Sequence, residues 1–96
     1  MAEREESLED VRRAIDAVDV QVVGLLAERE RLVRRAASFK KDEQGVRAPA
    51  RVEQVIEKVR ALAGERNASP EVVERVYRAM ITAFIELELT EHRENR

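Results

Sequence analysis

Residues 7–41, SLEDVRRAIDAVDVQVVGLLAERERLVRRAASFKK, decide the fold. Their apolar side chains recur at alternating steps of three and four residues, which places them in a stripe along one side of a helix. The stripe consists of Leu8, Val11, Ile15, Val18, Val22, Leu25, Leu32, Ala36 and Phe39. It predicts one helix of about 33 residues, or roughly 50 Å. Such a stripe must be buried against other helices.

The length of this helix indicates more than one chain. A compact monomer of 96 residues is expected to have a radius of gyration of about 13 Å, which a helix of roughly 50 Å does not fit. The rest of one chain is also too small to cover the whole stripe. We therefore predict a homodimer in which the long helices pack on each other.

The composition limits the class of protein. Lys plus Arg (18) and Asp plus Glu (20) nearly balance at a net charge of −2, whereas a nucleic-acid binder usually has a basic excess. There is no cysteine and one histidine, His92, so neither a thiolate nor a histidine-rich metal site is expected. No apolar run approaches the roughly 18 residues of a membrane span. The sequence predicts one cytoplasmic helical domain over residues 1–96, without nucleic-acid or membrane partners.

Two further helices are predicted after a break at residues 42–49. Gly45 is the expected end of the first helix, and Pro49 suits the start of a second helix over about residues 50–66. Ser69 and Pro70 are typical of the cap and first position of a third helix, which runs to about residue 91. The predicted fold is therefore all-α, with three helices per chain. The apolar faces are Val52, Val55, Ile56, Val59 and Leu62, then Val73, Val76, Tyr77, Met80, Ile81, Phe84 and Ile85.

Four charged residues interrupt the apolar faces: Arg29, Lys40, Arg51 and Glu88. In one continuous helix, Arg29 and Lys40 would share roughly one face, about 16 Å apart. Arg51 lies at the start of the second helix, where free backbone N–H groups also favour anions. If the four side chains converge, they form a positively charged pocket suited to a small dicarboxylate.

Each of the four also has an ordinary structural explanation. A lone arginine on a stripe commonly extends to water or joins a salt bridge, as Arg29 or Arg51 could. Lys40 could be a solvated cation near a helix end, and Glu88 could point to water. The remaining cations Arg31, Arg34 and Arg35 are interpreted as a solvated face. No P-loop, dinucleotide fingerprint or activated nucleophile is present, so a non-catalytic helical dimer that binds a partner or an effector is the alternative to an enzyme.

Several segments resemble a known family, the all-helical chorismate mutases and the related isochorismate pyruvate lyases. They are LEDVRRAIDAVD, LLAERERLV, FKKDEQGVRAPARV and VVERVYRAMI, which together extend over nearly the whole chain. The resemblance implies an intertwined homodimer with two equivalent active sites. It also implies a concerted Claisen rearrangement of chorismate to prephenate, with no cofactor and no covalent intermediate.

The resemblance assigns roles by position. Lys40 and Glu88 match the two groups that contact the ether oxygen of the breaking C–O bond. Arg29 and Arg51 match residues around the substrate carboxylates, and Arg12 matches an arginine that reaches into the partner's site. Helix geometry agrees with this role for Arg12. Arg12 is seventeen residues before Arg29 and about 100° away around the helix, so it cannot readily serve the same pocket as Arg29 in its own chain.

Three positions differ from the standard mutase pattern. Val52 replaces an acid that contacts the ring hydroxyl of the substrate, and Ala48 replaces an acid in the preceding loop. Phe84 replaces a serine near the ring carboxylate. The stretch FKKDEQGVRAPARV is closer to the lyase branch, which also has Pro and Arg-Val there. The resemblance thus favours chorismate mutase, with isochorismate pyruvate lyase, which forms salicylate and pyruvate, as the close alternative.

Overall fold

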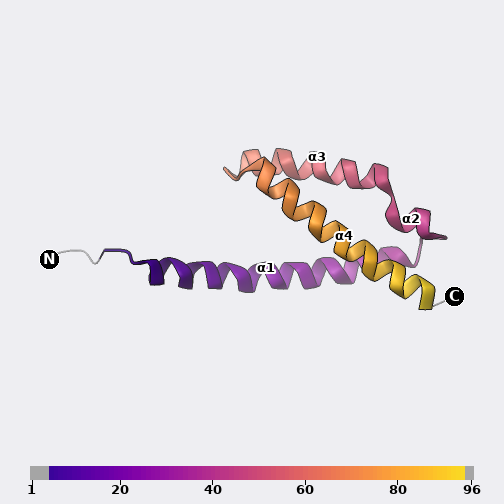
Figure 1. Cartoon of the computed structure of the whole chain (residues 1–96), viewed down its shortest axis with the longest axis horizontal. Helices are drawn as coiled ribbons and strands as arrows, with labels where there is room; N and C mark the ends of the chain where they lie inside the picture. Colours follow the sequence, from indigo (N-terminus) through magenta and orange to yellow (C-terminus); the bar gives the residue numbers. More distant parts are fainter. Residues whose placement is uncertain (1–4, 95–96) are drawn as a thin grey trace. The chain divides into compact units, whose positions relative to one another are not determined.

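The computed structural model describes residues 5–94, and in this range the chain forms α-helices and no strand (Figure 1). Helix α1 spans Leu8–Ala37, α2 spans Glu43–Arg47, α3 spans Pro49–Glu65 and α4 spans Pro70–Glu94. The predicted all-α class is therefore confirmed. None of these helices combines the length and the apolar character that crossing a membrane requires. The chain divides after Leu32 into an N-terminal and a C-terminal unit.

In the N-terminal unit, α1 begins at a reciprocal cap. The Asp10 N–H donates to Ser7 Oγ (3.1 Å), and the Ser7 N–H donates back to Asp10 Oδ2 (3.0 Å). No residue of α1 is buried within the single chain. Stripe residues remain accessible, as the exposed fractions of Leu8 (64%) and Leu25 (65%) show. The apolar stripe of α1 is therefore accessible.

Helix α1 ends at Ala37, earlier than predicted. The chain tightens there into i→i−3 bonds, from the Phe39 N–H to the Ala36 carbonyl (3.0 Å) and from the Lys40 N–H to the Ala37 carbonyl (3.1 Å). Phe39 lies outside the helix and is 85% exposed. The prediction that Lys40 shares one helical face with Arg29 is therefore wrong.

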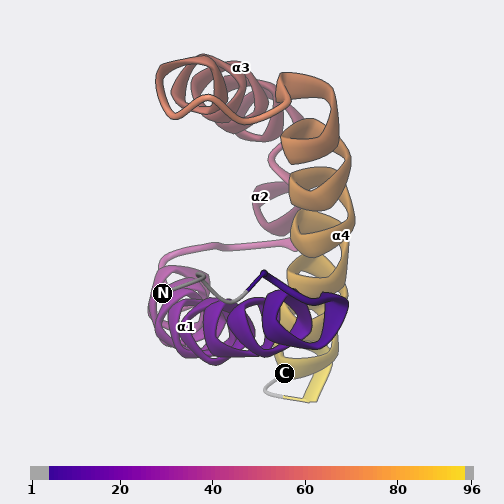
Figure 2. The ribbon, with the colours of Figure 1, turned by 90° about the vertical axis from the view of Figure 1, so that its left-hand side faces the viewer.

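The short helix α2 lies inside the predicted break. Asp42 caps it, with Oδ1 accepting a hydrogen bond from the Gly45 N–H at 2.9 Å. Gly45 thus belongs to a helix and does not end one, contrary to the prediction. Helix α2 packs against α4 (Figure 2), and its single buried residue is Val46, which is 3% exposed.

The boundaries of α3 follow local backbone rules. Ala48 joins α2 to α3 in the left-handed conformation (φ 36°, ψ 61°), and Pro49 begins α3 as predicted. At its C-terminus the Ala68 N–H donates to the Ala63 carbonyl (2.8 Å), and Asn67 has a positive φ of 59°. This is a Schellman motif, which satisfies carbonyls that the helix leaves free.

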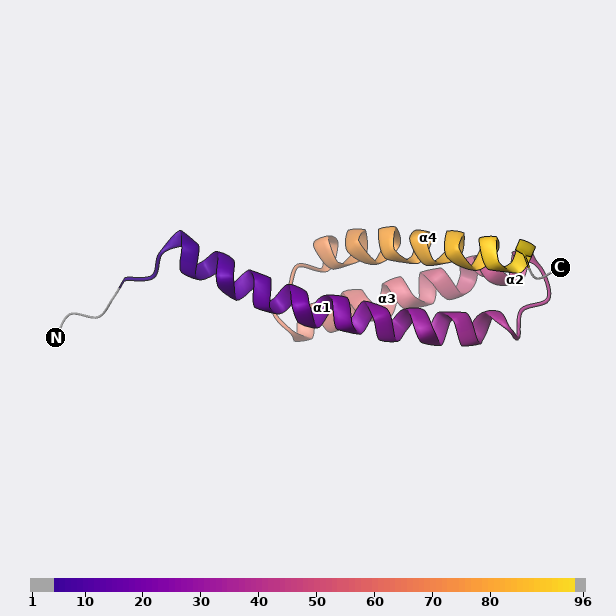
Figure 3. The same cartoon turned by 90° about the horizontal axis from the view of Figure 1, so that it is seen from below.

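Helix α4 begins where the cap signal predicts. Ser69 Oγ accepts a hydrogen bond from the Val72 N–H (3.2 Å), and Pro70 occupies the first helical position. The helix continues to Glu94, about one turn beyond the predicted end. Helices α3 and α4 run side by side in opposite directions (Figure 3).

The core of the C-terminal unit lies between α2, α3 and α4. Its buried apolar residues are Val46, Ile56, Val59, Ala63, Ile81 and Leu89. Two residues predicted to be buried are exposed in the single chain, Leu62 at 41% and Val76 at 58%. Arg60 on α3 and Glu74 on α4 form a hydrogen bond between the two helices. Leu62 lies two residues after Arg60, and Val76 lies two residues after Glu74. Two residues correspond to about 160° around a helix, so both point away from the packed side.

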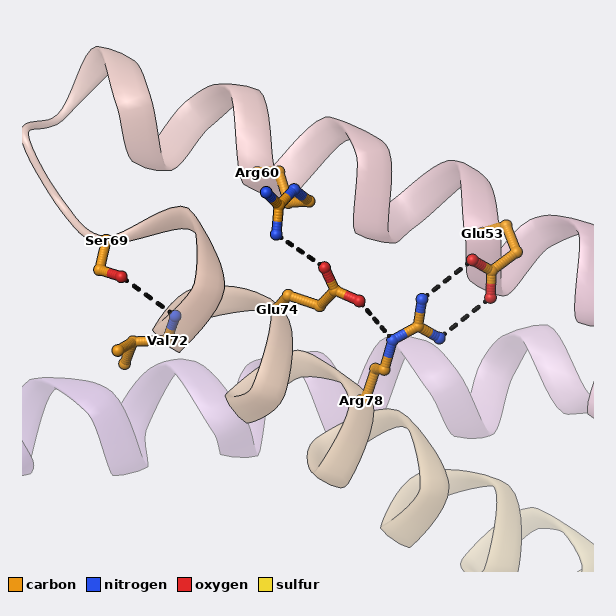
Figure 4. Close-up of polar contacts among 6 residues, drawn as sticks. All are labelled: Glu53, Arg60, Ser69, Val72, Glu74 and Arg78. Atoms are coloured by element: carbon orange, nitrogen blue, oxygen red, sulfur yellow. Dashed lines mark hydrogen bonds and ion pairs between the residues drawn. The ribbon is translucent and has the colours of Figure 1, made fainter.

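An ionic network fastens α3 to α4 at the protein surface (Figure 4). Arg78 donates through Nη1 and Nη2 to both oxygens of Glu53 (3.0 and 2.9 Å) and through Nε to Glu74 Oε2 (2.7 Å). Arg60 Nη1 donates to the other Glu74 oxygen at 2.8 Å. The hydrogen bonds from Arg78, with that from Arg60 to Glu74, hold the pKa of Glu53 and of Glu74 below its usual value.

Candidate functional site

A lysine and a buried glutamate meet in the C-terminal unit. Lys40 Nζ donates to Glu88 Oε2 at 2.8 Å. The Glu88 side chain is only 5% exposed and the Lys40 side chain 25% exposed. Burying a carboxylate so completely is costly unless a partner compensates its charge. Lys40 supplies that compensation, and its partial exposure leaves the pair open to solvent on one side.

The position of Glu88 follows from the helical repeat of α4. Glu88 lies seven residues after Ile81 and directly before Leu89, and all three are buried. Two helical turns separate Glu88 from Ile81, so both project from the same side of α4. Its burial confirms the prediction that this acid lies on an apolar face.

Lys40 reaches Glu88 from the connection between α1 and α2 and not from a helix. Two further ion pairs attach the chain to α4 on either side of Lys40. Arg34 of α1 pairs with Glu91, and Glu43 of α2 pairs with Arg93. Arg93 Nε donates to Glu43 Oε1 at 3.0 Å. Arg34, interpreted from the sequence as part of a solvated face, is therefore an ion-pair partner. These contacts join residues that are far apart in the sequence, so no local motif could have indicated them.

The remaining predicted site residues lie in both units. Arg51 is exposed in the first turn of α3, and Val52 beside it is half-buried. Phe84 is half-buried on α4, one turn before Glu88 and on the same side of the helix. In the N-terminal unit, Arg12 is exposed and Arg29 is half-buried on α1. Of the four charged residues predicted on apolar faces, the structure brings Lys40 and Glu88 into direct contact.

The contacting pair has a definite chemical capacity. The Lys40 ammonium is a compact cation that can donate to an oxygen on which negative charge develops. A carboxyl group beside it accepts hydrogen bonds when ionised and can donate one only when protonated. The pair can therefore present two donors to one oxygen atom if Glu88 takes up a proton.

Comparison with known proteins shows the family to which the chain belongs. A family model described as chorismate mutase type II matches residues 11–89, a range that includes Arg12, Lys40 and Glu88. Over 89 residues the chain is 30% identical to an isochorismate pyruvate lyase of Pseudomonas aeruginosa. The aligned part covers 93% of this chain and 88% of that relative. The resemblance noted in the sequence is thus confirmed, and the chain belongs to the chorismate mutase type II family, a family of enzymes.

Proposed function

We propose that the chain is a chorismate mutase, which converts chorismate to prephenate in a pericyclic reaction without a cofactor. The observation that carries this proposal is the contact between Lys40 and the buried Glu88. It supports the proposal because the reaction needs donors at one ether oxygen and needs no nucleophile. Membership of the chorismate mutase type II family supports the same reaction class.

In this proposal the cations hold the flexible dianion in a compact form. Arg29 and Arg51 bind its carboxylates, and Arg12 does so in the site of the other chain. Binding in this form brings the two carbon atoms that must bond close together. As the C–O bond stretches, negative charge builds on the ether oxygen, where Lys40 and protonated Glu88 donate hydrogen bonds. Removing one such preorganised donor typically lowers the rate by about 10² to 10³.

Isochorismate pyruvate lyase activity is the second candidate, and the relative with 30% identity favours it. Val52 favours it as well, because no acid stands at that position to contact the ring hydroxyl of chorismate. The lyase reaction uses the same two donors at the ether oxygen. It differs in that a ring hydrogen moves to the departing group, so that pyruvate leaves and no C–C bond forms.

The proposal includes a homodimer in which Arg12 crosses to the partner's site. The accessible stripe of α1 supports it, since no residue of α1 is buried within one chain. Sedimentation should show a dimer at micromolar concentration, and a folded monomer would refute this part of the proposal. Arg12→Ala and Lys40→Ala chains should each be nearly inactive. Refolded together they should regain activity, because one of the two sites then has both residues intact.

The decisive experiment supplies chorismate and isochorismate separately and identifies the products. Lys40→Ala should lower kcat at least about 10²-fold on the true substrate. Lys41→Ala is the matched control, because Lys41 is the next residue and is exposed, and it should retain activity. Equal loss in both variants would show that general positive charge matters and not a placed donor. No turnover of either substrate by the unmodified protein would refute the proposed function.

Glu88→Gln tests the second donor. An amide donates at every pH, whereas a carboxyl group donates only when protonated. At neutral pH, Glu88→Gln should therefore keep or raise the kcat/KM of the unmodified protein. Glu88→Ala should be slow. If Glu88→Gln is as slow as Glu88→Ala, or Glu88→Ala is as fast as the unmodified protein, Glu88 is not the ether-oxygen donor.

A further inference from the structure

An ion pair outside the proposed site connects α2 to the last turn of α4. Arg93 Nε donates to Glu43 Oε1 at 3.0 Å, and Glu43 is the first residue of α2. Both side chains are about half exposed, Arg93 at 53% and Glu43 at 48%. Exposed pairs of this kind add little to the stability of a fold. The main effect of the Glu43–Arg93 pair is therefore on the position of α2 and not on the stability of the fold.

The pair acts on the stretch of chain that carries Lys40. Lys40 and Glu43 are three residues apart, so their Cα atoms can be no more than about 11 Å from each other. Helix α2 also lies against the lysine, because a Cβ added at Gly45 would be 3.5 Å from Lys40 Cβ. Anchoring Glu43 on α4 thereby restricts where the Lys40 ammonium can lie relative to Glu88.

Helix α2 needs such an anchor. A helix of five residues is too short to be stable alone. The Asp42 cap shapes it, and Val46 is its one buried residue. Few contacts therefore fix α2 on α4, and one ion pair can change the fraction of molecules in which α2 is docked.

We infer that Glu43 and Arg93 are positioning residues, which hold the segment around Lys40 on α4 so that the lysine meets the ether oxygen. This inference rests on the proposed function, in which Lys40 is a donor to that atom. Neither residue touches the substrate in this account. A lysine displaced from its reacting position contributes less to the transition state, since small misplacements lower rates strongly.

Kinetics of Glu43→Gln, Arg93→Gln and the double variant test the inference. Each single variant should lower kcat about two- to fivefold, with little change in KM, because the lost interaction acts in the transition state. The double variant should be no slower than Glu43→Gln, because the ion pair with Arg93 is already lost in that single variant. High salt should screen the pair in the unmodified protein and bring its kcat toward that of the variants. Multiplicative losses in the double variant would overturn the pairing.

Arg60→Gln is the matched control. Arg60 makes a similar ion pair between α3 and α4 at 2.8 Å, with a side chain 42% exposed (Figure 4). Arg60→Gln should change the thermal stability about as much as Glu43→Gln does, and it should leave kcat unchanged. A loss of kcat equal to that of Glu43→Gln would mean that any weakening of helix contacts slows the enzyme, which would overturn the positioning role.

Amide hydrogen exchange gives a readout that does not depend on activity. Residues 40–47 should exchange faster in Glu43→Gln and Arg93→Gln than in the unmodified protein or Arg60→Gln, because α2 detaches more often. Unchanged exchange over these residues would overturn the inference whatever the kinetics. Faster exchange in a protein that turns over neither chorismate nor isochorismate would uphold the anchor and refute the proposed function, so the two failures are distinguishable.

Discussion

Replacing Lys40 by methionine should destabilise the protein far more than replacing Glu88 by glutamine. Methionine keeps an unbranched apolar stem and removes the ammonium. The Glu88 side chain is 5% exposed, so its carboxylate would remain inside without a counter-charge. The Lys40 side chain is 25% exposed and can turn toward water once the glutamate charge is gone. The two halves of one ion pair therefore have unequal effects.

The expected magnitudes follow from these exposures. Breaking a buried pair by removing one partner costs about 3–5 kcal/mol, because the other charge stays buried. Solvent reaches this pair from the lysine side, so about 3 kcal/mol is expected for Lys40→Met. Glu88→Gln should cost about 1 kcal/mol, since the amide oxygen still accepts a hydrogen bond from Lys40. The double variant also loses the hydrogen bond from Lys40 and should cost about 2 kcal/mol, less than Lys40→Met alone, which means that Glu88→Gln partly rescues Lys40→Met.

The assay is thermal or urea unfolding of the variants at neutral pH and one protein concentration, because dimerisation would couple stability to concentration. For a domain of this size, about 3 kcal/mol lowers Tm by about 12–24 °C. Lys41→Met is the control, and as an exposed residue it should change the free energy of unfolding by less than about 0.5 kcal/mol. Equal costs for Lys40→Met and Glu88→Gln, or no rescue in the double variant, would refute the reasoning.

Three further predictions concern the helices that hold the pair. Ser69→Ala should cost about 1 kcal/mol in urea unfolding, because Ser69 Oγ caps α4; no change would mean that Pro70 alone sets the helix start. Ala48→Val should destabilise by about 1–2 kcal/mol, since a β-branched residue is strained at φ 36°, and an unchanged Tm would contradict this. Arg78→Gln should destabilise at neutral pH, with a difference that shrinks as acid protonates Glu53 and Glu74.

The sign of the Arg78 prediction follows from the pKa shifts. Hydrogen bonds from Arg78 lower the pKa of Glu53 and of Glu74 from 4.5. A carboxyl group with a lowered pKa in the folded state stabilises the fold above its unfolded value, and the contribution is lost as the pH falls through the folded value. Urea unfolding at neutral pH and below pH 4.5 should therefore show the variant and the unmodified protein converging in acid. A constant difference would contradict this.

Local signals were sufficient to predict where the second and third long helices begin. Pro49 and the pair Ser69-Pro70 act within one turn of the chain, and α3 and α4 start where they indicate. The apolar repeat likewise predicted the burial of Ile56 and Ile81. These features depend on neighbouring residues alone, so the sequence determines them without knowledge of the rest of the fold.

The end of α1 was not predictable in the same way. Residues 36–41, AASFKK, contain neither glycine nor proline, and an apolar repeat continues to Phe39. The helix nevertheless stops at Ala37. Beyond it, the Lys40–Glu88 and Glu43–Arg93 contacts attach the chain to α4. Tertiary contacts therefore override local propensity here. Asp42 followed by Glu43 was a usable start signal for α2, but a helix with one buried residue leaves no periodic pattern.

The candidate site shows what a charge on an apolar face does and does not predict. Glu88 and Arg51 broke the pattern alike, yet Glu88 is 4% exposed and Arg51 is exposed in the single chain. The difference arises from position, because Glu88 lies well inside a long helix whose neighbouring turns are packed, whereas Arg51 occupies a first turn. A carboxylate on the packed side of a helix needs a counter-charge, which Lys40 supplies from elsewhere in the chain. Periodicity included Lys40 among the charged residues on apolar faces, but only the family resemblance paired it with Glu88 at one atom of the substrate.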